Sequence, residues 1–512
     1  MIKKLQSNKD KIAISLIILL AAFLRLYKIN GFMEFLGDQG RDVLIAYNIL
    51  HGHLTLLGPT ASVGGFFLGP IYYYFIAVFL LIFRFDPVGP AIMVALFGIL
   101  CVYLIYRFGN ELFGKGAGLI AALLFAVSPL VVTYAKFSWN PNLMPITTLL
   151  LMYFLYKGVY KNNLKFLLLS GILFGICMQL HYLELFIGVV AAFYIFLGNA
   201  FFTKLIWSKK LLQIIKSYAV YFFGFIIGFS PFLLFEVRHN FVNIRNIIQF
   251  IFHSPNTGSG NYLGIVSDIF FRVFARLLVN FPSASDYHLY NSSLISVSQI
   301  AIILLSLVSI IALLKVKNKL VALLFFLWLV LSVLLFGFYK KSIYDYYFEF
   351  LYPVPFILLG NLFYLLFKNA SKIGKTAIIF IVAILFLYNL YFANPLFAAP
   401  NYQKDQAKKI ADFVMKQAGG KPFNFALLTA HNSDYSYRFF FVTSNDSPIE
   451  ILNPAQDPNR KSVTSQLLVV CESLPCSPLD NPLWEIAGFG QAKIANHWRV
   501  SVVEVYKLIH TK

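Results

Sequence analysis

Charged residues are scarce in this sequence, because only 12% of its 512 residues are Asp, Glu, Lys or Arg. An ordinary soluble domain carries about twice that share, so the composition excludes one. The strict alternation of apolar and polar residues is also lacking, which excludes a transmembrane β-barrel. The sequence has only 22 acidic residues against 42 basic ones, which gives a net charge of +20. In a soluble protein such a charge would indicate that nucleic acid is a partner. The Lys residues fall mostly in short loops between apolar runs, so we interpret them as topology signals facing anionic lipid and expect no nucleic acid.

Cysteine is rare as well, with four residues. Cys101 and Cys177 lie in apolar runs and are expected to be inert packing residues. Cys471 and Cys476 lie close together in a polar segment, where a disulfide and two free thiols are equally open. A metal site built on this pair would lack further ligands.

Long apolar runs are what the sequence does have. Hydrophobic residues make up 59% of the chain, and its mean hydropathy is +0.73. Runs of about 20 apolar residues recur, which is the length needed to cross a bilayer core roughly 30 Å thick. The sequence therefore predicts an all-α polytopic integral membrane protein with about eleven transmembrane helices. We expect them near 12–30, 88–107, 115–134, 144–160, 164–181, 183–203, 217–236, 294–314, 320–338, 350–367 and 374–393.

The run at 66–83 decides the orientation of every later helix. If it lies along the membrane surface, the basic loops after it fall on the same side as the Lys-rich N-terminus. If it spans, those loops turn outward. We therefore predict a surface helix here, a cytoplasmic N-terminus with a retained first helix, and an outer C-terminus. The expected location is a bacterial-type plasma membrane.

Two domains are expected. Residues 1–394 form the membrane module, whose outer loops are 31–87, 135–143, 237–293 and 339–349. Residues 395–512 change in composition and predict a small extracytoplasmic α/β domain. Within it, 404–416 has helical periodicity, and 423–428, 467–471 and 500–507 are typical of strands.

The first outer loop holds the sequence Gly-Asp-Gln-Gly-Arg-Asp at 37–42. Charge next to hydrocarbon is costly, so such a cluster indicates function. Asp38 is the candidate catalytic base, although it could instead cap a helix that starts at Gln39. Arg41 is one helical turn later and suits a phosphate, or it could pair locally with Asp38 or Asp42. Asp42 is expected to give support.

Three further clusters lie on the same predicted side. Trp139, Asn140 and Asn142 surround Pro141, where an interface anchor and turn formation are the alternatives to sugar binding. His181, Tyr182 and Glu184 follow a helix, and a structural His–Glu pair is the alternative there. Lys340 and Lys341, with Tyr347 close by, break the positive-inside pattern and could bind an anionic head group, or form a solvated loop. The pair His51 and His53 is a weak metal signal, so no metal is expected.

These motifs, in this order, resemble the GT-C membrane glycosyltransferases. The likeness covers most of residues 10–365 and is strongest to the family-39-like group, which includes protein O-mannosyltransferases and lipid A aminoarabinose transferases. It rests on the acidic motif at 37–42, Gly-Pro-Ile-Tyr-Tyr-Tyr at 69–74, Ser-Trp-Asn-Pro-Asn at 138–142, His-Tyr at 181–182, and 231–240.

The resemblance implies a polyprenyl-phosphate sugar donor, an acceptor that is a protein, lipid or glycan, and surrounding membrane lipids as partners. It implies that Asp38 is the catalytic carboxylate and that Arg41 contacts the donor phosphate. Two departures stand out: Gln39 replaces the family's Glu, and Asn140 replaces its second acid. Both reduce the expectation of a divalent metal, and no cofactor is expected. The family's phosphate-binding Lys before Pro70 is Gly69 here, so Lys340 or Lys341 is the substitute.

The sequence thus predicts a glycosyltransferase that transfers a hexosyl or pentosyl group to an acceptor hydroxyl at the outer membrane face, with inversion. The alternative is a transporter or flippase for a lipid-linked glycan. That function predicts charged residues in mid-membrane and broken helices at matching places in two halves. The polar residues here gather at one face instead.

Overall fold

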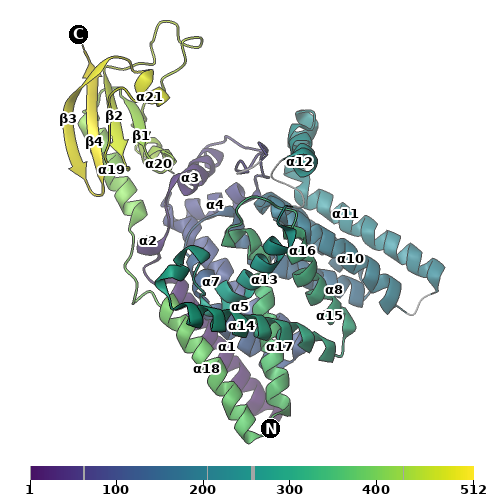
Figure 1. Cartoon of the computed structure of the whole chain (residues 1–512). Helices are drawn as coiled ribbons and strands as arrows, with labels where there is room; N and C mark the ends of the chain where they lie inside the picture. Colours follow the sequence, from purple (N-terminus) through teal and green to yellow (C-terminus); the bar gives the residue numbers. More distant parts are fainter. Residues whose placement is uncertain (1, 62–63, 204–205, 255–259, 431, 512) are drawn as a thin grey trace. The chain divides into compact units, whose positions relative to one another are not determined.

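The computed structural model describes residues 2–61, 64–203, 206–254, 260–430 and 432–511. The chain forms two compact units, which are coloured along the sequence in Figure 1. Unit 1 comprises residues 1–27, 54–75 and 92–399. Unit 2 comprises residues 28–53, 76–91 and 400–512, so the first outer segment packs with the C-terminal part of the chain. The predicted domain boundary at 394/395 stays a prediction.

Unit 1 is built of helices. In chain order they are α1 (Ile2–Leu26), α5 (Val88–Phe113, shared with unit 2), α6 (Lys115–Val127), α7 (Pro129–Tyr134), η1 (Asn140–Leu143), α8 (Met144–Tyr160), α9 (Leu164–Leu180), η2 (Tyr182–Glu184), α10 (Leu185–Phe202), α11 (Trp207–Arg238), α12 (Val242–His253), α13 (Tyr262–Val279), η3 (Ala284–Leu289), α14 (Ser292–Ile311), η4 (Ala312–Lys315), α15 (Lys319–Phe326), η5 (Leu327–Leu331), α16 (Ser332–Phe336), η6 (Asp345–Leu351), α17 (Pro353–Asn369) and α18 (Lys372–Ala393).

Each predicted crossing has a helix, but not every helix is long enough to cross on its own. Among the described residues, seven helical segments are long and apolar enough to span a membrane, and an eighth results if the bent pair 345–351 and 353–369 counts as one. α6 and α9 have only 13 and 17 residues. The fold is therefore that of a polytopic membrane protein, and the count of eleven crossings stays a prediction.

The predicted surface helix is α4 (Ile71–Ile82). Its 12 residues rise about 18 Å at 1.5 Å each, which is too short for a bilayer core of about 30 Å. One face is buried through Tyr72, Ile76 and Leu80, and Val78 and Ile82 are exposed. The helix is thus apolar on both faces, and its position along the membrane surface stays a prediction.

Glycines bring α9 and α11 into backbone contact. A Cβ added at Gly171 would lie 2.0 Å from the Tyr221 carbonyl oxygen, and one added at Gly228 would lie 2.0 Å from that of Ile172. Gly175 and Gly224 complete two Gly-x-x-x-Gly pairs, one on each helix. Small residues at this spacing let membrane helices approach closely where no hydrophobic effect drives them together.

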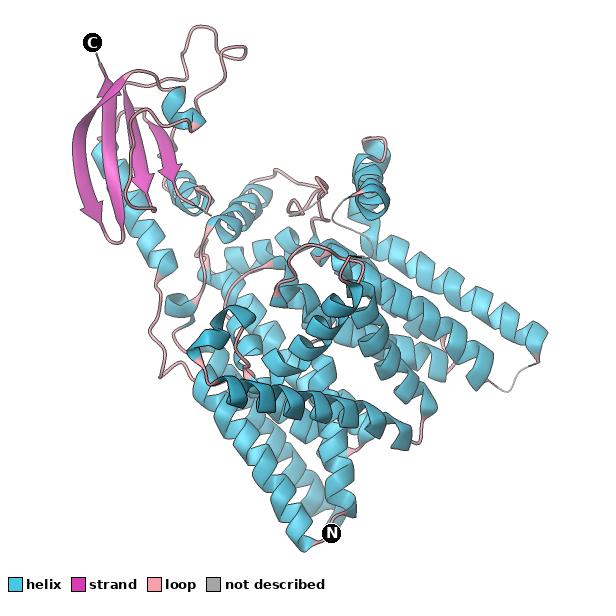
Figure 2. Ribbon diagram, in the orientation of Figure 1, coloured by secondary structure: helices cyan, strands magenta, loops and turns pink. Residues whose placement is uncertain are grey.

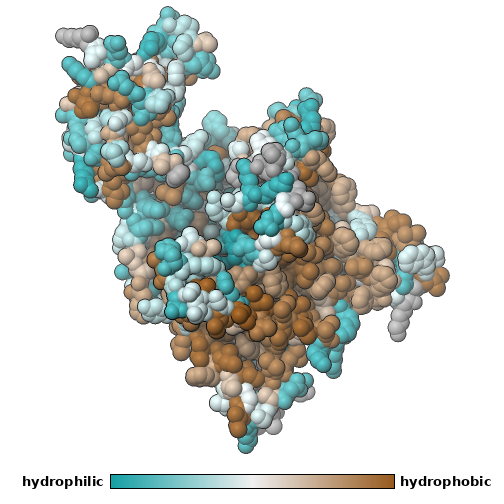
Figure 3. Space-filling view, viewed as in Figure 1, coloured by the Kyte–Doolittle hydropathy of each residue, from teal (hydrophilic) through white to brown (hydrophobic). Residues whose placement is uncertain are grey.

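The exposed surface of the helices of unit 1 is mostly apolar. Along α14 and α18 the exposed residues are mostly aliphatic or aromatic, and Figure 3 shows the resulting brown surface over the helices of this unit. Such a surface suits lipid. The exposed side chains are Leu294, Val297, Ile300, Leu304, Leu307 and Ile311 on α14, and Ile379, Phe380, Ile384, Leu387 and Tyr391 on α18.

Unit 2 contains the only sheet in the described part of the chain. Its strands are β1 (Asn424–Leu428), β2 (Gln466–Cys471), β3 (Ala492–Val500) and β4 (Val503–His510), in the order β1-β2-β4-β3 (Figure 2). β1 and β2 are parallel, and the other pairs are antiparallel. The helices are α2 (Ile29–Phe32), α3 (Gly37–Leu50), α19 (Gln403–Ala418), α20 (Tyr435–Thr443) and α21 (Trp484–Ala487). The sheet buries Leu467, Val469 and Leu508 with Phe489 in one core cluster.

The predicted α/β character of the C-terminal segment is confirmed. The helix expected at 404–416 is α19, and the strands expected at 423–428, 467–471 and 500–507 are β1, β2 and β4. β3 and α20 were not predicted, and β3 is an edge strand whose middle residues are mostly exposed. An edge strand lacks the apolar pattern that identifies a buried one. Cys471 and Cys476 form a disulfide.

Candidate active site

The acidic motif lies at the N-terminus of α3 in unit 2. The helix begins at Gly37, one residue before Asp38, so the alternative that Asp38 caps the helix is wrong. Gln39 caps the N-terminus of α3 instead, because its Oε1 accepts a hydrogen bond of 3.0 Å from the Leu36 backbone N–H. Gln39 is buried, and the Asp38 side chain is 52% exposed. Asp38 therefore presents a half-exposed carboxylate at the N-terminal end of a helix.

Arg41 is held between the two acids. Its Nη1 donates to Asp38 Oδ1 at 2.9 Å. Its Nε and Nη2 donate to Asp42 Oδ1 at 3.0 and 2.7 Å. The local pairing considered from the sequence is thus present. Because a guanidinium is planar and rigid, this arrangement fixes the orientation of the Asp38 carboxylate.

Asp42 is fully buried beneath this pair. Its Oδ2 has no hydrogen-bond partner among the described residues. Burial raises the pKa of Asp42 to about 7, and the Arg41 charge opposes that rise without cancelling it. The charge of Asp42 therefore depends on pH near neutrality, and its support role stays a prediction.

Asp42→Asn is expected to flatten the pH dependence of thermal stability. The unfolded carboxyl titrates near pH 4, so between about pH 4 and 7 the folded chain holds a proton that the unfolded chain has released. This contribution to stability is fully present below about pH 4 and is lost as the pH rises through about 7. It is worth roughly 4 kcal/mol, since each pH unit of difference equals about 1.36 kcal/mol.

The measurement is thermal unfolding of the full chain in detergent between pH 4.5 and 8. The matched control is Asp412→Asn, which removes an exposed carboxylate of α19. If wild type and Asp42→Asn give parallel curves of melting temperature against pH, Asp42 does not titrate in this range.

The two glycines of the motif bring α3 against α20. A Cβ at Gly37 would lie 1.9 Å from the Ser433 Oγ, and one at Gly40 would lie 2.3 Å from the Ser436 backbone nitrogen. The Gly37 N–H also donates to Asn432 Oδ1 at 2.8 Å. The C-terminal segment therefore fixes the helix end that carries Asp38.

Gly40→Ala is expected to reduce any activity that depends on Asp38 by at least tenfold. The new methyl group collides with backbone, which cannot rotate away, so α3 must shift. A shift of about 1 Å at a reacting group can cost about 10²-fold. Turnover and melting temperature of the full chain test this. The control is Gly260→Ala, where an added Cβ meets only the Lys340 side chain at 3.6 Å or more. Wild-type turnover in Gly40→Ala would show that this approach does not position Asp38.

Unit 1 gathers residues of two predicted outer loops, 135–143 and 339–349, and the residues after α9 into one aromatic cluster. The His181 ring stacks on Tyr182 at 4.7 Å and lies 5.3 Å from Tyr347. Trp139 lies 4.4 Å from Tyr346, and Tyr182 is hydrogen-bonded to Tyr339. The aromatic cluster comprises Trp139, His181, Tyr182, Tyr339, Tyr344, Tyr346 and Tyr347.

His181 is neutral in this cluster. Its ring is buried, and desolvation lowers its pKa to about 3. The Nδ1 atom accepts from the Leu183 N–H at 3.3 Å. The expected pair with Glu184 does not form, because Glu184 accepts from Thr148 at 3.2 Å instead. Glu184 thus contributes to packing around the cluster.

Asn140 and Asn142 have local roles. The Asn140 amide donates to the Leu180 carbonyl and so ties the loop to the end of α9. The Asn142 amide donates to the Phe137 carbonyl at 3.0 Å. These contacts agree with turn formation and also place Trp139. Lys136, in the same loop, is largely buried, and desolvation lowers its pKa to about 8.

Lys340 and Lys341 are exposed, and within the described ranges no hydrogen bond or ion pair holds them. Their loop is anchored just beyond them through Asp345. Arg272 Nη2 lies 2.6 Å from Asp345 Oδ1, and Arg276 Nε lies 2.9 Å from Oδ2. These two arginines of α13 were not singled out from the sequence, since charge alone did not show that they converge.

The weak metal signal in the sequence was the pair His51 and His53. His51 Nδ1 donates to the Tyr47 carbonyl at 2.8 Å, and His53 is exposed. Over the described residues there is no group of three His, Cys, Asp or Glu side chains close enough to hold a metal ion.

Sequence reasoning missed a second polar group in unit 2. Asn432 donates to both oxygens of Glu472 at 3.1 Å, and Tyr437 donates to Oε1 at 2.7 Å. Because Asn432 also accepts from Gly37, this group adjoins the acidic motif. The spacing of Gly37 and Gly40 is the sequence feature that could have pointed to this group. Two glycines on one helix face indicate that another segment packs closely there, but they do not identify that segment.

Comparison with known proteins finds matches of three kinds. Residues 68–235 match the family model described as dolichyl-phosphate-mannose-protein mannosyltransferase. YycA of Bacillus subtilis (strain 168), which its name describes provisionally as a mannosyltransferase, is 31% identical over 127 residues. That match covers 25% of this chain and 18% of YycA, so the chain matches less than a fifth of that relative.

Several solved structures match over most of the chain. ArnT from Cupriavidus metallidurans bound to undecaprenyl phosphate has a TM-score of 0.61 at 12% identity and covers 96% of this chain and 97% of its own. The oligosaccharyltransferase AglB from Archaeoglobus fulgidus, with an inhibitory peptide and dolichol-phosphate, has a TM-score of 0.56 at 12% identity. That match covers 91% of this chain and 69% of AglB. At this identity the likeness concerns the fold.

Proposed function

We propose that this chain, which has the GT-C fold of membrane glycosyltransferases, transfers a sugar from a polyprenyl-phosphate donor to an acceptor hydroxyl. The observation that carries the proposal is the Asp38 carboxylate. It is half-exposed at the start of α3 and is oriented by Arg41. The match of residues 68–235 to a family that uses a lipid-phosphate sugar supports the donor class.

In this mechanism Asp38 is the general base. It accepts the proton of the acceptor hydroxyl while that oxygen forms a bond to the anomeric carbon. The bond between the anomeric carbon and the phosphate oxygen breaks, and polyprenyl phosphate leaves with the electron pair. The displacement is direct, so the anomeric configuration inverts. The transferred group is a hexosyl or pentosyl residue.

Arg41 is proposed to act on both the catalytic base and the donor phosphate. Its contact with Asp38 holds the base, and its positive charge favours a phosphate group at the same helix end. Lys340 and Lys341 are the further candidates for the phosphate, because both are exposed cations without an ion pair in the described chain. Gln39 and Asp42 support Asp38 through the helix end and through Arg41.

The aromatic cluster is proposed to contact substrate. Trp139, Tyr182 and Tyr347 offer aromatic faces and hydroxyl groups, which suit both a sugar ring and a membrane interface. His181 is neutral and therefore can donate or accept a hydrogen bond without carrying charge. Asn140, Asn142 and Glu184 hold the loops that bear these groups.

The proposed topology places the N-terminus in the cytoplasm and the C-terminal domain outside. It rests on the distribution of Lys residues and on the length of α4, which supports a surface helix.

The test is incubation of the purified chain with labelled polyprenyl-phosphate sugars and candidate acceptors, followed by mass spectrometry. We expect release of polyprenyl phosphate together with a glycosylated acceptor. A flippase would instead move an intact lipid-linked sugar between the leaflets of proteoliposomes. Movement without any covalent transfer would overturn the proposal.

A further inference from the structure

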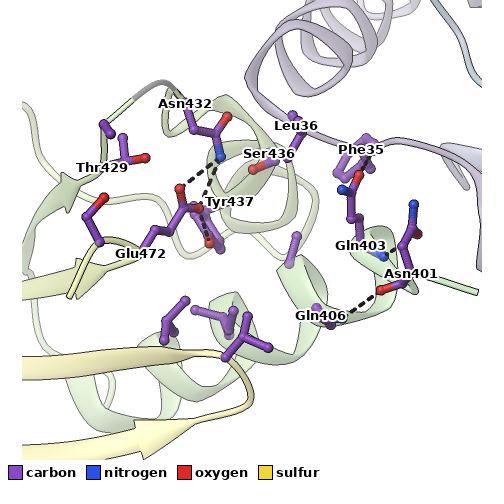
Figure 4. Close-up of a pocket in the computed structure, with 16 residues that line it drawn as sticks. Phe35, Leu36, Asn401, Gln403, Gln406, Thr429, Asn432, Ser436, Tyr437 and Glu472 are labelled. Atoms are coloured by element: carbon purple, nitrogen blue, oxygen red, sulfur yellow. Dashed lines mark hydrogen bonds between the residues drawn. The ribbon is translucent and has the colours of Figure 1, made fainter. Parts of the chain in front are cut away.

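Unit 2 contains a cavity of about 570 Å³ directly beside the acidic motif. This volume lies within the range of about 300–1,000 Å³ that is typical of small-molecule sites. Figure 4 shows its walls: Asn432, Tyr437 and Glu472 on one side, and Asn401, Gln403 and Gln406 on the other. Phe35 and Leu36 also line it, and Gly37 and Asp38 follow them in the chain.

The lining combines apolar side chains with polar groups that the protein satisfies only in part. Glu472 is fixed by three hydrogen bonds from Asn432 and Tyr437. The hydroxyls of Thr429, Ser436 and Ser473 have no hydrogen-bond partner among the described residues, and Ser436 is buried. Polar groups that face a cavity without a protein partner need water or a ligand.

The charge of the lining selects among ligands. Glu472 is its one ionisable acid, and no described lining residue is basic. A phosphate or an acidic sugar would meet the Glu472 carboxylate, with no cation among the described lining residues to balance it, and like charges disfavour binding. A neutral polyhydroxyl group suits the amides and hydroxyls, and an amine gains an ion pair with Glu472.

We propose that this cavity binds a neutral or amine-bearing sugar residue of the acceptor, whose hydroxyl the Asp38 carboxylate activates. The inference rests on the proposed function and deepens it, since it assigns a glycan-type acceptor and a subsite for it. The cavity is linked to the acidic motif through Asn432, which contacts both Glu472 and the N–H of Gly37, the residue before Asp38.

Two variants of the full chain test the cavity. Glu472→Gln removes the negative charge and keeps the shape. Ser473→Trp fills the cavity from an exposed position, so the fold is expected to tolerate it. The matched control is Ser447→Trp, which adds the same side chain at an exposed position outside the lining.

Binding is measured first, by saturation-transfer NMR of the chain in detergent without donor. The probes are methyl glucoside, glucosamine, glucose 6-phosphate and a serine tripeptide. We expect methyl glucoside and glucosamine to bind and the phosphate to fail. Ser473→Trp should weaken both sugars at least tenfold, and Glu472→Gln should weaken glucosamine more than methyl glucoside. Unchanged sugar binding in both variants, or binding of the tripeptide alone, overturns the proposal.

Turnover separates this inference from the proposed function. With an active donor and acceptor pair, Ser473→Trp should raise the acceptor KM at least tenfold and leave the donor KM unchanged, whereas Ser447→Trp changes neither. An unchanged acceptor KM refutes the subsite while transfer stands. Sugar binding that responds to the variants in a chain that transfers nothing refutes the proposed function while the cavity stands.

Discussion

Asp38→Asn is expected to lower sugar transfer by about 10²- to 10⁴-fold, the usual contribution of a positioned general base. Asn has the same size as Asp, and its carbonyl oxygen can still accept the hydrogen bond that Arg41 Nη1 gives to Asp38. Arg41 also keeps its two bonds to Asp42. The helix end should therefore stay in place, and the loss is one of proton acceptance.

The measurement is turnover at saturating donor and acceptor, with donor affinity determined separately. Donor affinity is expected to stay within a few-fold of wild type, because Asp38 carries no positive charge for the phosphate. The matched control is Asp412→Asn, whose side chain is 48% exposed against 52% for Asp38 and lies in the same unit. Full turnover by Asp38→Asn in a folded chain would remove Asp38 from the mechanism.

Arg41→Gln is expected to damage both activity and stability. It removes the group that orients Asp38, and loss of one preorganised polar contact typically costs about 10²- to 10³-fold in turnover. It also leaves the buried Asp42 without a partner, since Oδ2 already has none in the described chain. Loss of that partner is expected to lower the stability, most of all above about pH 7, where the Asp42 carboxylate is charged.

The double variant Arg41→Gln with Asp42→Asn separates the two effects. The amide that replaces the Asp42 carboxylate carries no charge, so the melting temperature should recover most of what Arg41→Gln loses. Turnover should stay low, because Asp38 is still not oriented and no cation replaces Arg41. Thermal unfolding and turnover of the four forms complete the cycle. If restoring stability also restores turnover, Arg41 acts only through the fold.

The fold could be predicted from the sequence to a large extent. Apolar runs of membrane length located every helix of unit 1 that was expected to cross, and the change of composition after 394 located α19, β1, β2 and β4. Two elements were not predicted, β3 and α20. β3 is a polar edge strand and α20 is short, so neither shows a clear periodicity of hydrophobic residues. The packing of the first outer segment with the C-terminal part could not be foreseen, because it depends on contacts such as that between Gly37 and Asn432, which are 395 positions apart.

The sequence indicated which residues belong to the candidate site, but it indicated less well which of them contact one another. Asp38, Arg41 and Asp42 stood out because charge is rare, and the structure joins them. The aromatic cluster unites His181, Trp139 and Tyr347 as their shared side had suggested. Glu472 and Asn432 were missed, since single polar residues in a polar segment carry no pattern. Their connection to the motif is visible only in the structure, through the hydrogen bond from the Gly37 N–H to Asn432.

The most direct measurement of the central claim is the fate of a polyprenyl-phosphate sugar of known anomeric configuration. The purified chain is given the donor and an acceptor, and NMR determines the configuration of the new glycosidic bond while released polyprenyl phosphate is quantified. The mechanism predicts one polyprenyl phosphate per bond formed, an inverted configuration, and loss of both signals in Asp38→Asn. A retained configuration, transfer from a nucleotide sugar in place of the lipid donor, or wild-type turnover by Asp38→Asn would contradict it.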